Sequence, residues 1–362
     1  MMKRLHLYLI PAILVAGIFT VAQAGGDDST LAHAAGGTSF NTFYAPSYQI
    51  PDAQGMSASA ARGKDLVHAT YGSLGAGSAV RASNGLPYVG NKLSCTNCHM
   101  GDGTQPNASP LIVVAQKYAA PGLFNSRSNS LLDVAGRVNG CFERSLVGQP
   151  LPVDSQWMKD IVAYLDFLGA GVQPGYTFTQ VPGQGFPSVD LLTRAADPVR
   201  GKQIFTGSCA SCHRADGNGS SNTPPVWGTN SFGLMSGMGR LATATTLVYG
   251  AMPRNRVDPT DPSTRLSQAD AWDVSAYLLS NSRPFDARFV ADWTGTGPDG
   301  MPNWLRKPAS ASYDFTMPRS NAGVATDDPS MPAMFPSEQH IFGPFQPIED
   351  ALKAARNERG FP

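Results

Sequence analysis

The stretch LSCTNCHM, residues 93–100, carries two cysteines separated by two residues and followed at once by a histidine: Cys95, Cys98 and His99. C-x-x-C-H is the attachment pattern of a c-type haem. The two thiols can form thioether bonds to the porphyrin vinyl groups, and the adjacent histidine then directs its ring at the iron. Taken alone, one such motif could also be a redox C-x-x-C pair or half of a zinc site.

A second copy of the motif removes most of this ambiguity. The stretch GSCASCHRADGNG, residues 207–219, repeats the pattern with Cys209, Cys212 and His213. Zinc sites more often show paired C-x-x-C motifs without the trailing histidine. Two complete motifs in one chain therefore predict two covalently bound haem c groups.

The sequence around the motifs is repeated as well. Residues 61–71, ARGKDLVHATY, resemble residues 199–209, VRGKQIFTGSC, and both are expected to form a helix before the haem motif. Residues 154–171 and 267–282 are amphipathic helical stretches, each with a tryptophan followed by a tyrosine. The order helix, C-x-x-C-H, loop, distal ligand and terminal helix thus occurs twice. This order predicts an all-α fold of two class I cytochrome c domains.

We place the first domain at residues 40–175 and the second at residues 195–284, with a Gly- and Pro-rich linker between them. A loop-rich extension, residues 285–362, is expected to wrap the domains, and only residues 348–358 look helical in it. An insertion rich in Gly, Ser and Asn lies within residues 71–94, before the first motif. It is either a substrate-side loop or a plain surface loop.

The chain begins with a secretory signal pattern. Lys3 and Arg4 precede an apolar stretch, residues 7–21, and an A-x-A site ends at Ala24. The alternative, an uncleaved membrane anchor, would need roughly 20 apolar residues. We therefore predict a signal peptide at residues 1–24 that is removed after Ala24. The mature protein is then expected in the periplasm without a membrane span.

The composition narrows the classes of function. The chain has 27 basic and 27 acidic residues, and charged residues make up only 15% of it. Such a near-neutral balance gives no support for binding nucleic acid or for a polybasic membrane patch. The 38 glycines and 29 prolines predict long loops, as in a protein packed around something other than its own side chains.

Each six-coordinate haem iron needs a second axial ligand, usually methionine or histidine. After His213 the candidates are Met235, Met238 and Met252. Met252 precedes a proline in a loop just before the terminal helix, which is where a class I domain carries its distal methionine. We therefore predict Met252 as the ligand and a packing role for Met235.

The first domain lacks such a methionine. Between His99 and the terminal helix, the only other histidine or methionine is Met100, which adjoins His99 and cannot reach the far side of the haem. In residues 136–146, GRVNGCFERSL, the unpaired Cys141 stands 42 positions after His99, close to the 39-position gap in the second domain. A thiolate ligand here would push electron density onto the iron. The alternatives are a buried free thiol and an intermolecular disulfide.

Polar residues surround Cys141 in the sequence. Arg137, Cys141 and Arg144 have the i, i+4, i+7 spacing of one helix face, and Ser145 follows four positions after Cys141. Arg127 lies one loop earlier. A guanidinium group lowers the pKa of a nearby thiol and grips oxyanions through paired hydrogen bonds. We take these residues as catalytic candidates, and for Arg127 and Arg137 the alternative of holding a haem propionate stays open.

Four stretches together resemble the dihaem thiosulfate dehydrogenases of the periplasm: YVGNKLSCTNCHM (88–100), GRVNGCFERSL (136–146), GAMPRN (250–255) and SEQHIFGPFQPI (337–348). The likeness covers most of the mature chain, and the stretch with the unpaired cysteine is its most specific part. The resemblance implies an enzyme that couples two thiosulfate anions into tetrathionate and releases two electrons. Some members of that family run the reaction in reverse. The implied electron acceptor is a small periplasmic cytochrome c or an iron–sulfur protein.

The resemblance also implies roles for individual residues. It assigns His99 and Cys141 to the catalytic haem, and His213 and Met252 to the haem that passes electrons on. Some family members carry a lysine beside the distal methionine that can replace it as the ligand. Residues 250–251 are Gly-Ala in this chain, so no such ligand exchange is expected from the local sequence.

Other functions are compatible with the same motifs. A non-catalytic dihaem electron carrier would have an ordinary methionine or histidine on the first haem and no use for Cys141. A Cys-ligated subunit of a multi-protein sulfur-oxidation complex would need a partner subunit, and a dihaem peroxidase would react with hydrogen peroxide. Of the remaining histidines, His68 is expected on a helix surface or in packing, and His340 in a structural or haem-propionate contact.

Overall fold

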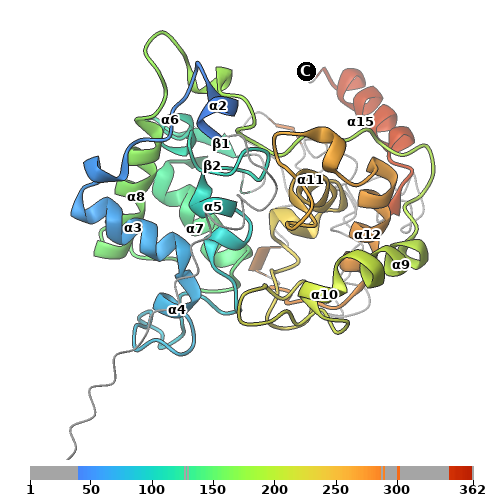
Figure 1. The fold of residues 1–362 in the computed structure, drawn as a ribbon, viewed down its shortest axis with the longest axis horizontal. Coiled ribbons are helices and arrows are strands. Elements are labelled where there is room, and N and C mark those ends of the chain that lie inside the picture. Colours follow the sequence, from blue (N-terminus) through green and yellow to red (C-terminus); the bar gives the residue numbers. More distant parts are fainter. Residues whose placement is uncertain are drawn as a thin grey trace, which may run out of the picture.

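Two helical bodies lie side by side in the computed structural model of the chain (Figure 1). The structure describes residues 40–125, 128, 130–286, 288–289, 300–301 and 342–360. The predicted signal peptide lies outside these residues. Within them, the sheet content is one antiparallel pair, β1 (Leu123–Asn125) with β2 (Ser130–Leu132). The predicted all-α class is therefore confirmed, with a short hairpin as the exception.

The helices and 3-10 turns divide between the two bodies, which we call the first and second unit. The first unit contains α2 (Phe40–Tyr44), η1 (Ala53–Gly55), α3 (Ala58–His68), α4 (Thr70–Leu74), η2 (Cys95–Asn97), α5 (Met100–Gly103), α6 (Val114–Lys117), α7 (Val134–Arg144) and α8 (Gln156–Gly169). A connecting segment holds η3 (Phe178–Gln180). The second unit contains α9 (Pro198–Ser208), α10 (Ala210–His213), η4 (Gly237–Gly239), α11 (Leu241–Ala251), η5 (Pro262–Thr264) and α12 (Gln268–Ser280), with α15 (Gln346–Glu358) at its outer side.

The same close helix crossing occurs in both units. In the first unit α3 crosses α8, and a Cβ atom on Gly63 would overlap the backbone carbonyl of Asp160. In the second unit α9 crosses α12, and a Cβ atom on Gly201 would overlap the backbone carbonyl of Asp273. Glycine has no Cβ, so the two backbones can touch at each crossing. The internal repeat seen in the sequence is thus a repeat of structure.

Side-chain caps fix where the four crossing helices begin. A hydroxyl or carboxylate oxygen at each N-cap accepts a hydrogen bond from a backbone N–H in the first turn of its helix. Such caps each stabilise a helix by about 1 kcal/mol. The cap residues are Ser57 for α3, Ser155 for α8, Asp197 for α9 and Ser267 for α12.

A buried carboxylate lies at each crossing and is held by arginine. In the first unit, Arg62 donates to both carboxylate oxygens of Asp160 over 2.8 and 2.9 Å. The hydroxyl of Ser59 and the amide of Gln156 also donate to Asp160, over 2.6 and 2.8 Å. A buried charge is tolerated only when it is paired and hydrogen-bonded in this way.

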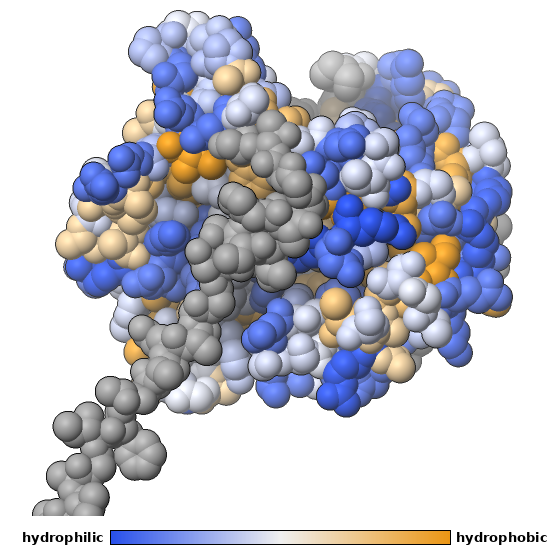
Figure 2. Space-filling view, viewed as in Figure 1, coloured by the Kyte–Doolittle hydropathy of each residue, from blue (hydrophilic) through white to orange (hydrophobic). Residues whose placement is uncertain are grey.

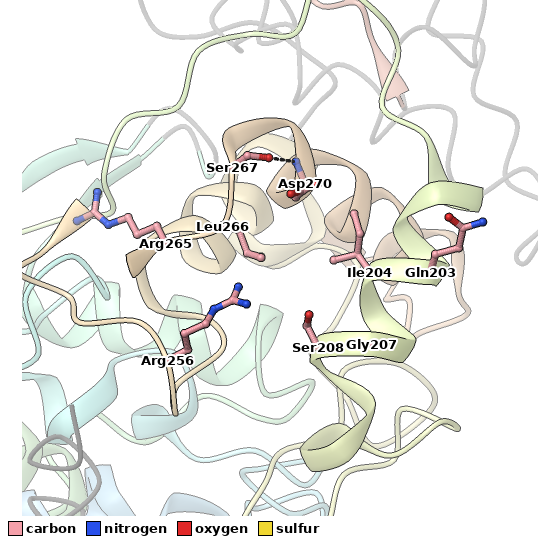
Figure 3. Close-up of a pocket in the computed structure, with 9 residues that line it drawn as sticks. All are labelled: Gln203, Ile204, Gly207, Ser208, Arg256, Arg265, Leu266, Ser267 and Asp270. Atoms are coloured by element: carbon pink, nitrogen blue, oxygen red, sulfur yellow. Dashed lines mark hydrogen bonds between the residues drawn. The ribbon is translucent and has the colours of Figure 1, made fainter. Parts of the chain in front are cut away.

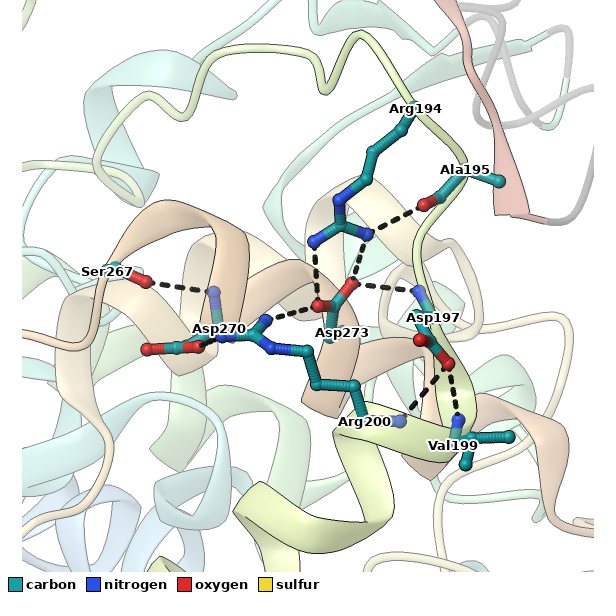
Figure 4. A network of polar contacts seen from close by, with 8 residues as sticks. All are labelled: Arg194, Ala195, Asp197, Val199, Arg200, Ser267, Asp270 and Asp273. Carbon is teal, nitrogen blue, oxygen red and sulfur yellow. Dashed lines mark hydrogen bonds and ion pairs between the residues drawn. The ribbon is translucent and has the colours of Figure 1, made fainter.

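The second unit has a larger version of this network (Figure 4). Arg194 donates to both carboxylate oxygens of Asp273, each over 2.8 Å, and Arg200 binds Asp273 and Asp270. The backbone N–H of Asp197 adds a further bond of 2.8 Å to Asp273. Arg194 belongs to the segment before α9, so this network ties the connecting segment to the second unit.

The paired carboxylate predicts how the first unit responds to acid. Hydrogen bonds, foremost from Arg62, lower the pKa of Asp160 to about 2. A carboxyl with a depressed folded-state pKa stabilises the fold above its unfolded pKa and loses this contribution as the pH falls through the folded value. The free energy of unfolding is therefore expected to fall between about pH 4 and pH 2.

The Asp160→Asn variant isolates this contribution. It is expected to lower the free energy of unfolding by about 1–3 kcal/mol at neutral pH, because hydrogen bonds to a charged group are lost. Urea unfolding at a series of pH values should also show a flatter acid limb for this variant. The exposed Asp65→Asn on α3 is the matched control. An acid limb as steep in Asp160→Asn as in the parent would contradict the assignment.

Apolar side chains pack into a separate core in each unit. The core of the first unit lies between α7, α8 and the end of the insertion, where Tyr88 and Val89 are buried. The core of the second unit surrounds Trp272 and includes Ile348 from α15. The rings of Trp272 and Phe345 are 5.7 Å apart, so the helical end of the C-terminal extension packs onto the second unit.

The two units share an interface near the end of α7. The side chain of Phe232 packs against the cores of both units. Asn91 donates to the carbonyl of Ser231 over 2.9 Å, and the N–H of Gly233 donates to the carbonyl of Ser145 over 3.2 Å. The helix that carries Cys141 therefore ends directly on a loop of the second unit.

Hydrophilic side chains dominate the face shown in Figure 2, where apolar residues form small separate patches. In the part of the chain that the structure describes, no helix combines the length and apolar character needed to cross a bilayer. Among the described residues, three exposed large apolar side chains lie together on the β1–β2 hairpin, Leu123, Phe124 and Leu131. The others are Leu86, Val153, Tyr176 and Val199.

Candidate functional site

The first C-x-x-C-H motif lies against the interface between the units. Cys95 begins the short turn η2, and its thiol lies 3.3 Å from the hydroxyl of Thr70. Cys98 packs against the core of the second unit. Burial raises the pKa of the Cys95 thiol to about 11 and that of the Cys98 thiol to about 12. Both thiols are thus neutral at ordinary pH.

The histidine of this motif has a fixed ring. His99 Nδ1 lies 2.6 Å from the carbonyl oxygen of Ser109. A backbone carbonyl can only accept, so Nδ1 carries the proton and Nε2 is left as the free donor of an electron pair. This is the ring orientation that a metal-ligating histidine requires.

Helix α7 carries Cys141 toward this histidine. Asp133 caps the helix by accepting from the N–H of Gly136 over 2.7 Å. Phe142 and Leu146 are buried in the core of the first unit and fix the rotation of the helix. Cys141 projects from a different part of the helix surface, where its thiol meets His99.

Arg137, Cys141 and His99 form one interacting group. Arg137 Nη1 donates to Cys141 Sγ over 2.9 Å. Burial alone would raise the pKa of Cys141, but the charge of Arg137, together with the neighbouring His99 ring, outweighs it, and the pKa is lowered to about 6. Cys141 is therefore a thiolate at neutral pH, in contrast to the haem-motif thiols Cys95 and Cys98. The i, i+4 spacing that predicts a shared helix face for Arg137 and Cys141 lies within α7, where the two side chains touch.

Tyr118 is a further member of this group, and no sequence pattern indicates it. Its side chain lies beside the Arg137 guanidinium, whose pKa is raised chiefly by the charge of Cys141 and additionally by Tyr118. Tyr118 is buried at the end of α6, nine residues after Ser109. No local motif marks it, because its contact with α7 depends on the tertiary fold. The same short segment therefore contacts both His99 and Arg137.

The other predicted polar residues lie elsewhere or outside the described chain. The guanidinium of Arg144 stacks over the ring of Phe289 at 4.2 Å, and its Nη1 lies 4.0 Å from Glu143. The carbonyl of Ser145 accepts hydrogen bonds at the interface between the units. Arg127 and His340 are not among the described residues. Among the predicted polar residues, Arg137 is the one whose side chain the structure shows in contact with the Cys141 thiol within the described chain.

The surface histidine of the first unit is separate from this group. His68 ends α3 with a half-exposed side chain, and its Nδ1 lies 2.8 Å from the carboxylate of Asp102. This agrees with the expected helix-surface position. The insertion before the first motif packs against the end of α7, where the N–H of Gly90 donates to the carbonyl of Leu146 over 2.9 Å.

The second motif repeats the arrangement of the first. His213 Nδ1 lies 3.0 Å from the carbonyl oxygen of Pro224, which again leaves Nε2 free. Met252 packs in the same apolar cluster as Cys209 and Trp227. Burial raises the pKa of the Cys209 thiol to about 11 and lowers the pKa of His213. Cys212, the remaining thiol of the motif, is exposed at the surface.

The two other methionine candidates for the second haem have packing positions. Met235 and Met238 are buried in the core around Trp272, away from the cluster that holds Met252. Their burial agrees with the expected packing role of Met235.

The donor sets fit haem irons. Among the described residues there is no cluster of three or more His, Cys, Asp or Glu side chains that could hold a free metal ion. A haem iron takes four nitrogens from its porphyrin and needs only two axial groups from the protein. The facing pair His99 and Cys141, and the pair His213 and Met252 at the second motif, are donors of the required kinds.

A surface cavity of about 500 Å³ adjoins the second motif (Figure 3). It opens beside the end of α9, just before Cys209, and Arg256 and Arg265 lie on its other side. Asp270 at its rim is engaged by Arg200. The lining thus carries two guanidinium groups, Arg256 and Arg265, and one carboxylate, Asp270.

Comparisons with known proteins agree with this geometry. The cytochrome c family model matches residues 198–282, which is α9 to α12 with the second motif. The thiosulfate dehydrogenase of Stutzerimonas stutzeri is 33% identical to the chain over 289 residues, covering 77% of this chain and 86% of that relative. The thiosulfate dehydrogenase of Allochromatium vinosum is 35% identical over 207 residues, covering 54% of this chain and 72% of the relative.

A solved structure is similar as well. It is a thiosulfate dehydrogenase (TsdBA) from Marichromatium purpuratum in its as-isolated form, with a TM-score of 0.56 and 27% identity. The match covers 67% of this chain, and the chain spans only half of the length of that protein.

Proposed function

This chain belongs to the thiosulfate dehydrogenase family and is a c-type cytochrome enzyme, and from this premise we propose that it oxidises thiosulfate to tetrathionate at the Cys141 group. Two thiosulfate dianions lose one electron each, and one sulfur–sulfur bond forms between them. We propose that electrons leave the first unit for the second and then pass to a small acceptor protein, a cytochrome c or an iron–sulfur protein, in the periplasm.

The contact between Arg137 and the Cys141 thiolate, 2.9 Å long, is the single observation that carries this proposal. A pure electron carrier has no use for a half-buried thiolate with its own cation. Two thiosulfate dianions repel each other as they approach, and the repulsion is strong in a site of low dielectric constant. A fixed guanidinium beside the reacting sulfur offsets part of this repulsion without reorganising during the reaction.

We propose two haem c groups, attached at Cys95 and Cys98 and at Cys209 and Cys212. Each haem, when bound, supplies a one-electron redox centre. The chain contributes the axial side chains, His99 with Cys141 and His213 with Met252. In support, both histidines are oriented by a backbone carbonyl, 2.6 Å from His99 Nδ1 and 3.0 Å from His213 Nδ1.

Within the first site we assign the residues distinct tasks. Cys141 faces His99 and can contact a sulfur substrate, while Arg137 holds the thiolate form and attracts the anion. Arg144, Ser145 and Arg127 stay predictions as further anion-binding residues. Arg144 and Ser145 lie at the end of α7 next to the second unit, so this end of the helix is where an approaching anion would meet them.

The direct test is an assay of the purified holoprotein with thiosulfate and ferricyanide. We expect ferricyanide to be reduced only when thiosulfate is present, with one tetrathionate formed for every two electrons transferred. Absence of tetrathionate under these conditions, with both haems bound, would contradict the proposal. Hydrogen peroxide should not reoxidise the reduced protein at a comparable rate, which separates the enzyme from a dihaem peroxidase.

A further inference from the structure

Residues 99–109 of the first unit make contacts at both haem sites. At one end lies His99, the proposed axial histidine, and at the other end the carbonyl of Ser109 orients its ring over 2.6 Å. Between them, Met100 and Ala108 are fully buried against the end of α11, in a cluster that contains Ala251 and Met252. The segment that positions His99 at the first site therefore also touches the loop that carries Met252 at the second site.

Asn107 makes the polar part of this contact. Its side-chain amide donates to the carbonyl oxygen of Pro259 over 2.7 Å. The same oxygen accepts from Arg265 Nη2 over 3.2 Å, and the Arg265 guanidinium lies 5.1 Å from the centre of the Tyr249 ring on α11. The loop after Met252 is thus held at the carbonyl of Pro259. Asn107 of the first unit binds this carbonyl from one side, and Arg265, which lies over a ring on α11, binds it from the other.

The backbones also approach closely beside Met252. A Cβ atom on Gly250 would lie 2.6 Å from the carbonyl oxygen of Asn107 and 2.6 Å from Pro187 Cδ. Those distances are too short for real atoms, so the contact exists only because residue 250 is glycine. Asn107 itself has a φ of 61°, a left-handed conformation that asparagine tolerates better than most residues.

We propose that residues 99–109 act as a clamp in which Asn107 and Met100 of the first unit hold the loop of Met252 in position for the second haem. This inference rests on the proposed ligand role of Met252. Coordination at the second site then depends on docking of the second unit against the first. Asn107 and Met100 are positioning residues, since they act through the loop and do not themselves reach the iron.

The strength of the clamp can be measured by letting imidazole compete with Met252 for the iron of the second haem. Free imidazole displaces a methionine ligand from a ferric haem, and the sulfur-to-iron charge-transfer band of the methionine complex disappears as it does so. A loosened loop lets imidazole compete better. Asn107→Gly removes the amide donor but keeps the left-handed backbone, so the apparent imidazole affinity should rise about fivefold, the value of one hydrogen bond.

A second variant tests the clamp from the other side. In an isolated helix Gly250→Ala would strengthen α11, because alanine is the better helix former. The clamp predicts the opposite, since the new methyl group pushes the loop away from Asn107, and imidazole affinity should rise at least as much as in Asn107→Gly. Asn84→Gly is the matched control, because it removes a hydrogen bond of 3.0 Å that the side-chain amide of Asn84, in the insertion, donates to Gln149. Its imidazole affinity should equal that of the parent.

The imidazole measurements can contradict the clamp in three ways. Equal imidazole affinity in the parent, Asn107→Gly and Gly250→Ala would overturn the clamp, and so would tighter methionine coordination in Gly250→Ala. A parent protein without the charge-transfer band would overturn the role of Met252 and the clamp together. None of these measurements uses thiosulfate, so failure of the clamp would leave the proposal of tetrathionate formation standing.

Discussion

Replacing Cys141 with glycine is expected to abolish tetrathionate formation, with a loss of at least about 10³-fold in kcat/KM. The reason is that the variant removes the thiolate that Arg137 holds at 2.9 Å and that faces His99. Both C-x-x-C-H motifs are untouched, so the protein should still carry two haems. The measurement is the thiosulfate and ferricyanide assay, with the haem content per chain determined by the pyridine haemochrome method.

Two further variants make this result specific to the thiolate. Cys141→Met keeps a sulfur ligand without an ionisable thiol, and it should also be inactive while the electron paramagnetic resonance signal of a thiolate-ligated haem disappears. Ala135→Gly weakens α7 by a comparable helix-propensity cost, about 1 kcal/mol, and should retain activity. Tetrathionate formation by Cys141→Gly at a rate near the parent's would contradict the proposed site.

The parts of the fold that sequence could predict are those set by local signals. The start of α9 at Pro198, after its cap Asp197, follows from residues adjacent in the chain. Position in the chain also singled out Cys141, because between His99 and the terminal helix the only other histidine or methionine is Met100, which adjoins His99. The structure brings this thiol to His99, although the two are 42 positions apart.

What sequence could not predict depends on contacts between distant segments. The i, i+4, i+7 spacing placed Arg137, Cys141 and Arg144 on one face, but Arg144 is the last residue of α7, where the ring of Phe289 from the extension packs against its guanidinium. Tyr118 had no motif at all. The strand β1 has only three residues, which is too short for an alternating pattern to show.

Replacing Arg137 with glutamine should slow thiosulfate oxidation by about 10²-fold. Arg137 gives the largest favourable contribution to the thiolate form of Cys141, so its loss should raise the pKa of that thiol. The approaching dianion also loses a cation that lies 2.9 Å from the reacting sulfur. Arg137→Lys keeps the charge but loses the planar fork, so part of the activity should return.

Tyr118→Phe gives the intermediate case and shows whether orientation of Arg137 matters as well as its charge. Only the hydroxyl beside the guanidinium is removed, so a loss of about three- to tenfold is expected, in line with one hydrogen bond. Lys159→Gln removes one positive charge from the exposed surface of α8 and should leave the rate unchanged. We expect kcat/KM to decrease from the parent to Tyr118→Phe and further to Arg137→Gln. This order tests whether the two side chains act together. If Arg137→Gln retained more than a third of the parent rate, thiosulfate would have to be attracted by other cations, and the 2.9 Å contact would serve only to hold the thiolate.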